Sequence, residues 1–205
     1  MPDDSRQKEA TVTTPTAMPP TPSLRRLGLA AGLTLALALP AAGQGETITA
    51  HGITTFPGGD LKYPADFEHL DYVNPEAPKG GEMSIWAFGG FDSMNPYTIK
   101  GRADRLASIQ YESLLTGTAD EVGSSYCLLC ETMEYPADRS EVVFTLREGI
   151  TFSDGSPLTA EDIAFSYALF RDKGLPSFRA VLARSVAGAE VLDDRRVRFT
   201  FVEDA

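Results

Sequence analysis

Two cysteines, Cys127 and Cys130, are separated by a C-x-x-C spacing and are the only cysteines among the 205 residues. This spacing suits a local disulfide, dithiol–disulfide exchange or one half of a zinc site. An exchange site would place the pair at the start of a helix in a βαβ unit, and the surrounding residues match that context poorly. A zinc site needs two further ligands, whereas both histidines, His51 and His69, lie far upstream. We therefore favour structural thiols or a local disulfide, with redox exchange and metal binding as the alternatives.

A glycine-rich aromatic loop is the best candidate for contacting a small ligand. Residues 82–88 indicate a strand, and residues 88–97 follow it as a loop. Ligands of α/β proteins bind beyond the carboxyl ends of strands, glycines allow a close backbone approach, and a carboxylate can accept from a ligand amine. The expected contacts are Phe88, Gly89, Gly90, Phe91, Asp92 and Ser93, with Tyr126 at the edge of the cleft. Alternatively, Asp92, Ser93 and Asn95 bond only to the local backbone, as such residues do in turns.

The sequence contains no motif of a common enzyme class. The phosphate-binding G-x-x-x-x-G-K-[ST], the dinucleotide-binding G-x-G-x-x-G and the nucleophile motif G-x-S-x-G are all missing. Carboxylates are plentiful, but no two of them are singled out as a glycosidase pair. Asp154 lies in a predicted turn, and Glu161 and Asp162 open a predicted helix, so these acids have structural explanations. We expect a protein that is not an enzyme and that needs no cofactor and no metal.

The clearest structural pattern lies in residues 142–170. Apolar residues alternate along residues 142–147, which predicts a strand. The dipeptide Asp154-Gly155 predicts a turn, and Thr159 followed by Asp162 predicts a helix with a capping box. One face of this helix is apolar and consists of Ala160, Ile163, Ala164, Tyr167 and Phe170.

Other segments complete the predicted α/β fold, a mixed sheet with packed helices. A second apolar stripe predicts a helix over residues 103–115, and a shorter helix is expected over residues 175–184. Residues 190–192 and 196–201 should form a hairpin. Residues 44–81 are rich in Gly and Pro without a sustained period, so we expect an extended N-terminal arm there.

The N-terminal region has the pattern of an export signal. Arg25 and Arg26 precede an apolar run at residues 27–39, and small residues follow up to Gly43. These features predict a cleaved secretory signal peptide over residues 1–43, with Met18 as an alternative start. The run is shorter than the ~20 residues of a membrane span, and no cysteine follows it to carry a lipid. We therefore expect a periplasmic protein that is not a lipoprotein.

The charge balance argues against polyanionic partners. The chain has 18 basic and 29 acidic side chains, a net charge of −11, and residues 44–205 alone carry −12. Nucleic acids require basic side chains to neutralise their phosphates, so no nucleic-acid partner is expected. The acidic surface keeps the protein soluble, and it could also attract cationic peptides mildly.

Two stretches resemble a known family. Residues 146–167, LREGITFSDGSPLTAEDIAFSY, closely resemble the signature of the family 5 extracellular solute-binding proteins, the peptide-type receptors of ABC importers. The wording of residues 51–81, with HGI, KYP-x-DF and H-x-DYVNP-x-APKGG, resembles the YejA-like branch, which is tied to import of oligopeptides and microcin C. The resemblance implies a monomeric, two-lobed binding protein of type II that delivers peptides, or peptide-nucleotide antibiotics, to an inner-membrane permease.

The same resemblance sets the expected domain organisation. Family members are well over twice as long, so residues 82–205 are expected to form the N-terminal part of a truncated solute-binding domain. An exported thiol–disulfide protein using Cys127 and Cys130, and a truncated fragment without transport function, are the alternative hypotheses.

Overall fold

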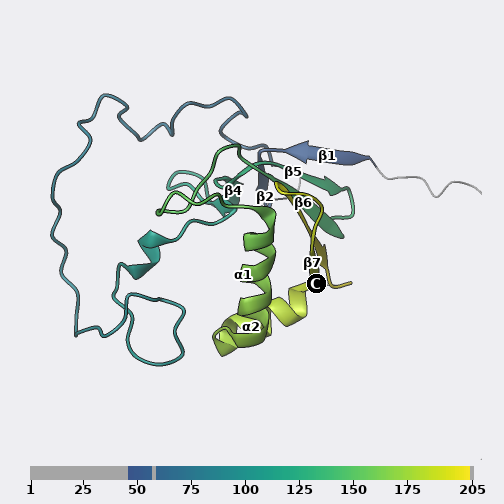
Figure 1. Cartoon of the computed structure of the whole chain (residues 1–205). Coiled ribbons are helices and arrows are strands. Elements are labelled where there is room, and N and C mark those ends of the chain that lie inside the picture. The colour runs from purple at the N-terminus through teal and green to yellow at the C-terminus, as the bar shows by residue number, and fades with distance from the viewer. Residues whose placement is uncertain (1–45, 57–58, 204–205) are drawn as a thin grey trace, which may run out of the picture. The chain divides into compact units, whose positions relative to one another are not determined.

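The computed structural model describes residues 46–56 and 59–203, which form two β-sheets and two α-helices (Figure 1). The predicted signal peptide, residues 1–43, lies outside these residues. In the described residues, no helix combines the length and apolar character needed to cross a membrane. The elements are β1 (Thr47–Ala50), β2 (Gly52–Thr54), η1 (Ala107–Gln110), β3 (Leu115–Thr116), β4 (Ser124–Cys127), β5 (Cys130–Pro136), β6 (Glu141–Leu146), α1 (Ala160–Lys173), α2 (Pro176–Ser185), β7 (Val186–Val191) and β8 (Arg196–Phe201).

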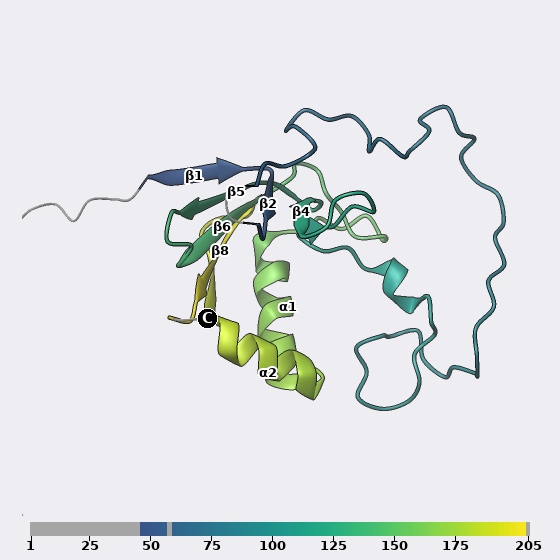
Figure 2. The same cartoon turned by 180° about the vertical axis from the view of Figure 1, so that it is seen from behind.

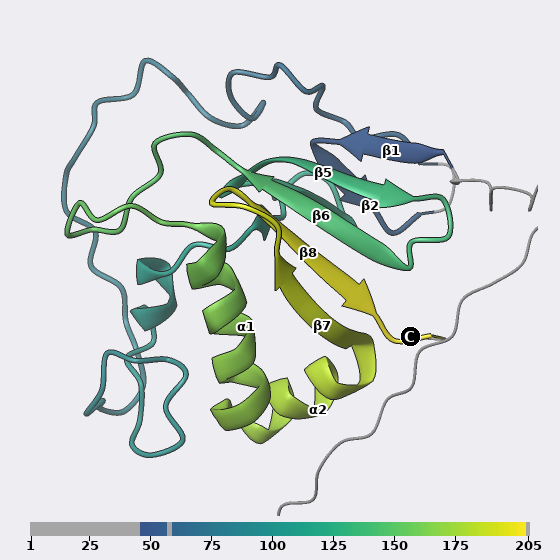
Figure 3. The same ribbon diagram turned by 45° about the vertical axis from the view of Figure 1, so that its right-hand side comes forward.

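The strands form a large sheet in the order β1-β5-β6-β8-β7 and a small sheet in the order β2-β4-β3. Every ladder between these strands is antiparallel, so the expectation of a mixed sheet is corrected. The reason is connectivity, because short turns join β5 to β6 and β7 to β8, and such turns allow only antiparallel pairing. The α/β class and the helices packed on a sheet are confirmed (Figure 3).

The core lies on one face of the large sheet. Pairing places Val142 opposite Phe199 and Phe144 opposite Val197, so these side chains share a face. Helix α1 covers part of this face, and the ring of Tyr167 lies 5.7 Å from the ring of Phe199. Burying a side chain of this size contributes about 1.5–3 kcal/mol relative to leaving it exposed. The buried residues of this core are Cys127, Cys130, Met133, Val142, Phe144, Leu146, Ala160 and Val197.

Local sequence signals produced the expected elements around α1. The backbone N–H of Thr159 and its hydroxyl both donate to Asp162 Oδ2 at 2.9 Å, so the predicted cap is confirmed. Gly155 has a φ of +86° in the predicted turn, a conformation that residues with a Cβ adopt reluctantly. Helix α2 and the hairpin of β7 and β8 also lie where the pattern predicted them.

Two of the predicted elements do not form. Residues 82–88 are not a strand, because no strand among the described residues pairs with them, and Met83 and Trp86 are exposed. Residues 103–115 are not a long helix but contain only the single turn η1, because Leu115 pairs with Cys127 in the small sheet. The start of the predicted N-terminal arm also differs, since β1 and β2 each join a sheet and only the residues after them form a loop.

Candidate functional site

The predicted ligand loop closes on itself. The backbone N–H groups of Asp92 and Ser93 donate to the carbonyl oxygen of Arg102 at 3.0 and 3.2 Å, and the N–H of Asp104 donates to Ser93 O at 2.9 Å. Ser93 and Ala103 form an isolated parallel bridge. We call residues 88–104 the ligand loop. Figures 1 and 2 show it on the opposite side of α1 from the large sheet.

A cavity of about 440 Å³ lies in the ligand loop, and its lining consists of Gly90, Phe91, Asp92, Gly101 and Arg102. The backbone N–H of Arg102 donates to Asp92 Oδ1 at 2.6 Å, and the Arg102 guanidinium donates to Gly90 O at 3.4 Å. One carboxylate and one guanidinium therefore lie at the same small cavity. Groups of opposite charge on a ligand can be bound there, because a carboxylate accepts several hydrogen bonds and a guanidinium donates up to five.

The structure brings together three of the expected contacts, Gly90, Phe91 and Asp92, at this cavity. Phe88 is 89% exposed, and Phe91 is 59% exposed. Gly89 borders Arg102, whose guanidinium lies 2.9 Å from the position that a Cβ on Gly89 would take. The Ser93 hydroxyl oxygen accepts from the N–H of Asn95 at 3.0 Å. Ser93 and Asn95 thus make the local backbone bonds of the alternative interpretation, since Asn95 Oδ1 accepts from the N–H of Tyr97 at 2.9 Å. Asp92 instead accepts from the backbone of Arg102, ten positions away, and lines the cavity.

An aromatic cluster attaches the ligand loop to the helices. The ring of Tyr97 lies 5.1 Å from Tyr111, 4.9 Å from Phe170 of α1 and 5.9 Å from Phe178 of α2. Rings at these distances attract each other beyond their buried area. Tyr97 has no local sequence signal, because its partners lie between 14 and 81 positions away along the chain.

Tyr126 is not at a cleft edge with the ligand loop. It is only 2% exposed, and its ring lies 5.7 Å from Tyr63 and 5.9 Å from Phe67. Its hydroxyl accepts from the N–H of Tyr63 at 3.1 Å and donates to the Glu121 carboxylate. Burial raises the pKa of Tyr126, and its hydroxyl lowers the pKa of Glu121. Tyr126 belongs to β4 and instead attaches to this strand the arm segment that follows β2.

A charged cluster completes this attachment of the arm. Lys62 Nζ lies 2.5 Å from Asp120 Oδ2 and 2.8 Å from Asp71 Oδ2, and the Tyr63 hydroxyl donates to Asp120 Oδ2 at 2.5 Å. Hydrogen bonds from Lys62 and then Tyr63 lower the pKa of Asp120 to about 2. The same contacts, with Asp120 first, raise the pKa of Lys62 above its usual range. Lys62, Tyr63, Asp71 and Asp120 bind one another, so we assign this cluster a structural role.

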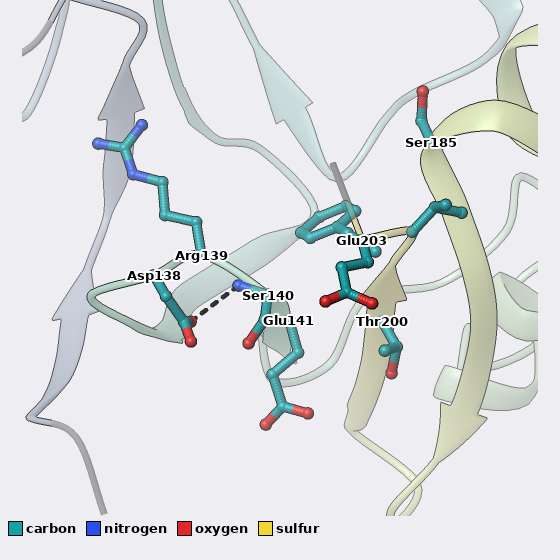
Figure 4. A pocket seen from close by; sticks show the side chains of 9 residues that line it. Asp138, Arg139, Ser140, Glu141, Ser185, Thr200 and Glu203 are labelled. Carbon is teal, nitrogen blue, oxygen red and sulfur yellow. Dashed lines mark hydrogen bonds between the residues drawn. The ribbon is translucent and has the colours of Figure 1, made fainter. Parts of the chain in front are cut away.

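A larger pocket, of about 850 Å³, lies between the turn that joins β5 to β6 and the ends of α2 and β8. Phe201 N–H donates to Ser140 O at 2.9 Å, and Val202 N–H donates to Ser185 O at 3.1 Å, which holds the walls together. The N–H of Ser140 donates to Asp138 Oδ1 at 3.0 Å and lowers the pKa of Asp138 (Figure 4). No local sequence pattern indicates this pocket, because its walls come from residues 138–141, Ser185 and residues 200–203, which lie far apart along the chain. Its lining residues are Asp138, Arg139, Ser140, Glu141, Ser185, Thr200, Phe201, Val202 and Glu203.

Comparison with known proteins gives the family. The family described as bacterial extracellular solute-binding proteins, family 5 Middle, matches residues 126–205. The chain is 40% identical over 163 residues to the peptidoglycan-binding protein YepA and 39% identical over 170 residues to the probable peptide-binding protein YejA, both from Agrobacterium fabrum. Residues 126–205 match family 5, and the relatives of this chain include proteins named YejA. The resemblance to YejA-like family 5 proteins predicted from residues 51–81 and 146–167 is therefore confirmed.

The chain spans about a quarter of the length of these relatives. The matches cover 76% of this chain and 26% of YepA, and 82% of this chain and 27% of YejA. Among solved structures, the oligopeptide-binding protein AppA from Bacillus subtilis, in complex with a nonapeptide, superposes with a TM-score of 0.43 and 21% identity. That superposition covers 55% of this chain and 22% of AppA.

Proposed function

We propose that these residues belong to the substrate-binding component of an ABC importer that binds oligopeptides in the periplasm and delivers them to an inner-membrane permease. The observation that carries the proposal is the family 5 match. The 39% identity to a probable peptide-binding protein supports it. Such a receptor performs no catalysis on its ligand and is itself a monomer. Its signal to the permease is a closed conformation, which requires the peptide to favour the closed state over the open one.

We propose further that the ligand loop supplies some of the peptide contacts. Its cavity presents the Asp92 carboxylate, the Arg102 guanidinium and the exposed ring of Phe91. A guanidinium pairs well with a peptide carboxylate, and a carboxylate pairs with a peptide ammonium. An exposed aromatic ring covers apolar side chains without requiring one sequence. The combination suits a ligand that has both charges and variable side chains, which describes a peptide.

The source of the peptide is a separate question. YepA, named as peptidoglycan-binding, and YejA, named as probably peptide-binding, are almost equally identical to this chain. Peptides, peptidoglycan fragments and peptide-nucleotide antibiotics share peptide bonds and charged ends. Competition calorimetry with the complete protein separates them, using a synthetic oligopeptide, a peptidoglycan stem peptide attached to its sugar, and the sugar alone. Displacement by both peptide-containing compounds but not by the sugar supports peptide recognition, and displacement by the sugar alone contradicts it.

Export is part of the proposal and has its own test. Intact mass of the protein from a periplasmic extract should correspond to a chain that begins after Gly43 and carries no lipid. A mass that includes residues 27–39, or recovery from the cytoplasmic fraction alone, would contradict the assignment to the periplasm.

A further inference from the structure

The chain crosses between the two sheets at two places, and the cysteines mark the second of them. It leaves β1 of the large sheet at Ala50 and enters β2 of the small sheet at Gly52. It returns between Cys127, which pairs with Leu115 in the small sheet, and Cys130, which pairs with Leu146 in the large sheet. Cys127 and Cys130 are joined by a disulfide. The covalent bond therefore connects one residue of each sheet.

The two crossings touch each other. The N–H of Cys127 donates to the carbonyl oxygen of His51, the single residue between β1 and β2, at 2.8 Å. The Arg147 guanidinium donates to Leu128 O at 2.8 Å and to Cys127 O at 3.3 Å. The N–H of Arg147 donates to Leu129 O at 3.0 Å. The carbonyl groups of Cys127, Leu128 and Leu129 in the returning crossing are thus all hydrogen-bonded.

The disulfide lies in the core. Cys130 is 0% exposed and Cys127 is 8% exposed, and both belong to the apolar cluster that includes Phe144 and Leu146. Exchange requires a thiolate to approach one sulfur while the other leaves. Cys130 is closed to such an approach, and Cys127 is almost closed. A charged thiolate would also have to enter an apolar region, which disfavours the charged form.

We propose that the Cys127–Cys130 disulfide is a shielded staple that holds the junction of the two sheets, and that it does not exchange with external thiols while the protein is folded. The bond closes a very short loop, so it restricts the unfolded chain less than a long-range disulfide does. Its main effect is therefore on the native junction, where it fixes the distance between the last residue of β4 and the first residue of β5. This role differs from the exchange role that the C-x-x-C spacing also allows, and it is independent of the ligand.

The test measures the rate of reduction in the complete protein. Dithiothreitol breaks the S–S bond by two successive thiolate attacks, the two cysteines gain two electrons and two protons, and the reagent becomes a cyclic disulfide. The reduction is carried out first under native conditions and then in guanidinium chloride. Samples are quenched with iodoacetamide, and their intact mass is measured by mass spectrometry. We expect the isolated protein to be fully oxidised and the native reduction to be at least ~10-fold slower than the denatured one. Free thiols in the isolated protein, or native reduction within about twofold of the denatured rate, would overturn the proposal.

A second measurement examines exchange and stability separately. The oxidised protein should not accelerate the reduction of insulin by dithiothreitol, and acceleration would overturn the proposal. The double variant Cys127→Ala, Cys130→Ala should melt at a lower temperature than the oxidised wild type, and an equal or higher melting temperature would contradict the staple. If the double variant does not fold, the wild-type reduction rates still decide the question, because they need no variant.

Discussion

The ring of Tyr97 lies 4.9 Å from the ring of Phe170, so the ligand loop rests on helix α1, although 73 positions separate the two residues. Tyr111 and Phe178 extend the same cluster to the chain after the loop and to α2. The loop has its own backbone closure between Asp92 and Arg102. Its shape is therefore fixed internally, while its place relative to the helices depends on Tyr97.

Replacing Tyr97 by Ala should separate the ligand loop from the helices. Each aromatic pair contributes about 0.5–1.5 kcal/mol beyond its buried area, and Tyr97 takes part in three pairs, so we expect the free energy of unfolding to fall by about 1.5–4.5 kcal/mol. Peptide affinity of the complete protein should fall about 10-fold if the loop contributes to the site, while Tyr97→Phe should stay near wild type because it keeps the ring. Calorimetry measures the affinity, and urea unfolding measures the stability. Wild-type affinity in Tyr97→Ala would show that the loop is not part of the binding site.

Replacing Gly101 by Ala should distort the closure of the ligand loop. Gly101 has a φ of +85°, and a Cβ there would lie 2.6 Å from Asp92 Oδ1. The unfavourable backbone conformation alone costs of order 1–3 kcal/mol in the free energy of unfolding. The control is Gly90→Ala, because a Cβ at Gly90 meets no atom within 4 Å and its φ is not positive. Equal stability of the two variants in urea unfolding would show that the loop does not hold this conformation.

The charged cluster of Lys62, Tyr63, Asp71 and Asp120, which attaches the N-terminal arm, predicts that stability depends on pH in the acid range. The pKa of Asp120 is about 2 in the fold, below its ordinary 3.8. Because the folded pKa is the lower one, the ionised group stabilises the fold above about pH 4, and this stabilisation is lost as the pH falls towards about 2. The melting temperature of Asp120→Asn should therefore be lower than that of the wild type at neutral pH, and the difference should shrink between about pH 4 and pH 2. A constant difference over this range, or an equal effect of the exposed-arm control Glu76→Gln, would contradict the assignment.

Loss of the cap at Asp162 should destabilise helix α1. The variant Asp162→Ala removes the acceptor of two bonds from Thr159 and should lower the free energy of unfolding by about 1 kcal/mol. Glu161→Ala, at an exposed site in the same first turn, should cost about half of that or less. Urea unfolding of both variants checks this, and similar losses would mean that charge near the helix start matters more than the cap.

The sequence predicted best those elements that depend on residues close together along the chain. The cap of Thr159 and Asp162 and the hairpin of β7 and β8 need only contacts between residues close along the chain. Residues 82–88 have a strand pattern, but a strand also needs a partner, and the described residues supply none. Tyr111 lies within residues 103–115, where an apolar stripe predicted a helix, yet it is 47% exposed, because η1 ends after one turn.

The candidate site was predictable only in part. Gly89, Gly90 and Asp92 of the ligand loop were found from residue type, since close approach and hydrogen bonding depend on it, whereas Gly101 was not. Arg102 was not found, because its place at the cavity comes from pairing across ten positions. Tyr126 was misplaced, since a tyrosine near a loop can line a cleft or fill a core, and the partners that decide this, Tyr63 and Glu121, belong to different segments.

The most direct measurement is calorimetric titration of the complete protein with oligopeptides, in the wild type and in Arg102→Ala. The matched control is Arg105→Ala, an exposed arginine outside the cavity lining. We expect saturable binding of one peptide with a Kd of about 1 μM or tighter, weakened about 10-fold or more in Arg102→Ala and unchanged in Arg105→Ala. Folded wild-type protein that binds no peptide would contradict the proposed function. Peptide binding that is identical in both variants would contradict the ligand loop as its site.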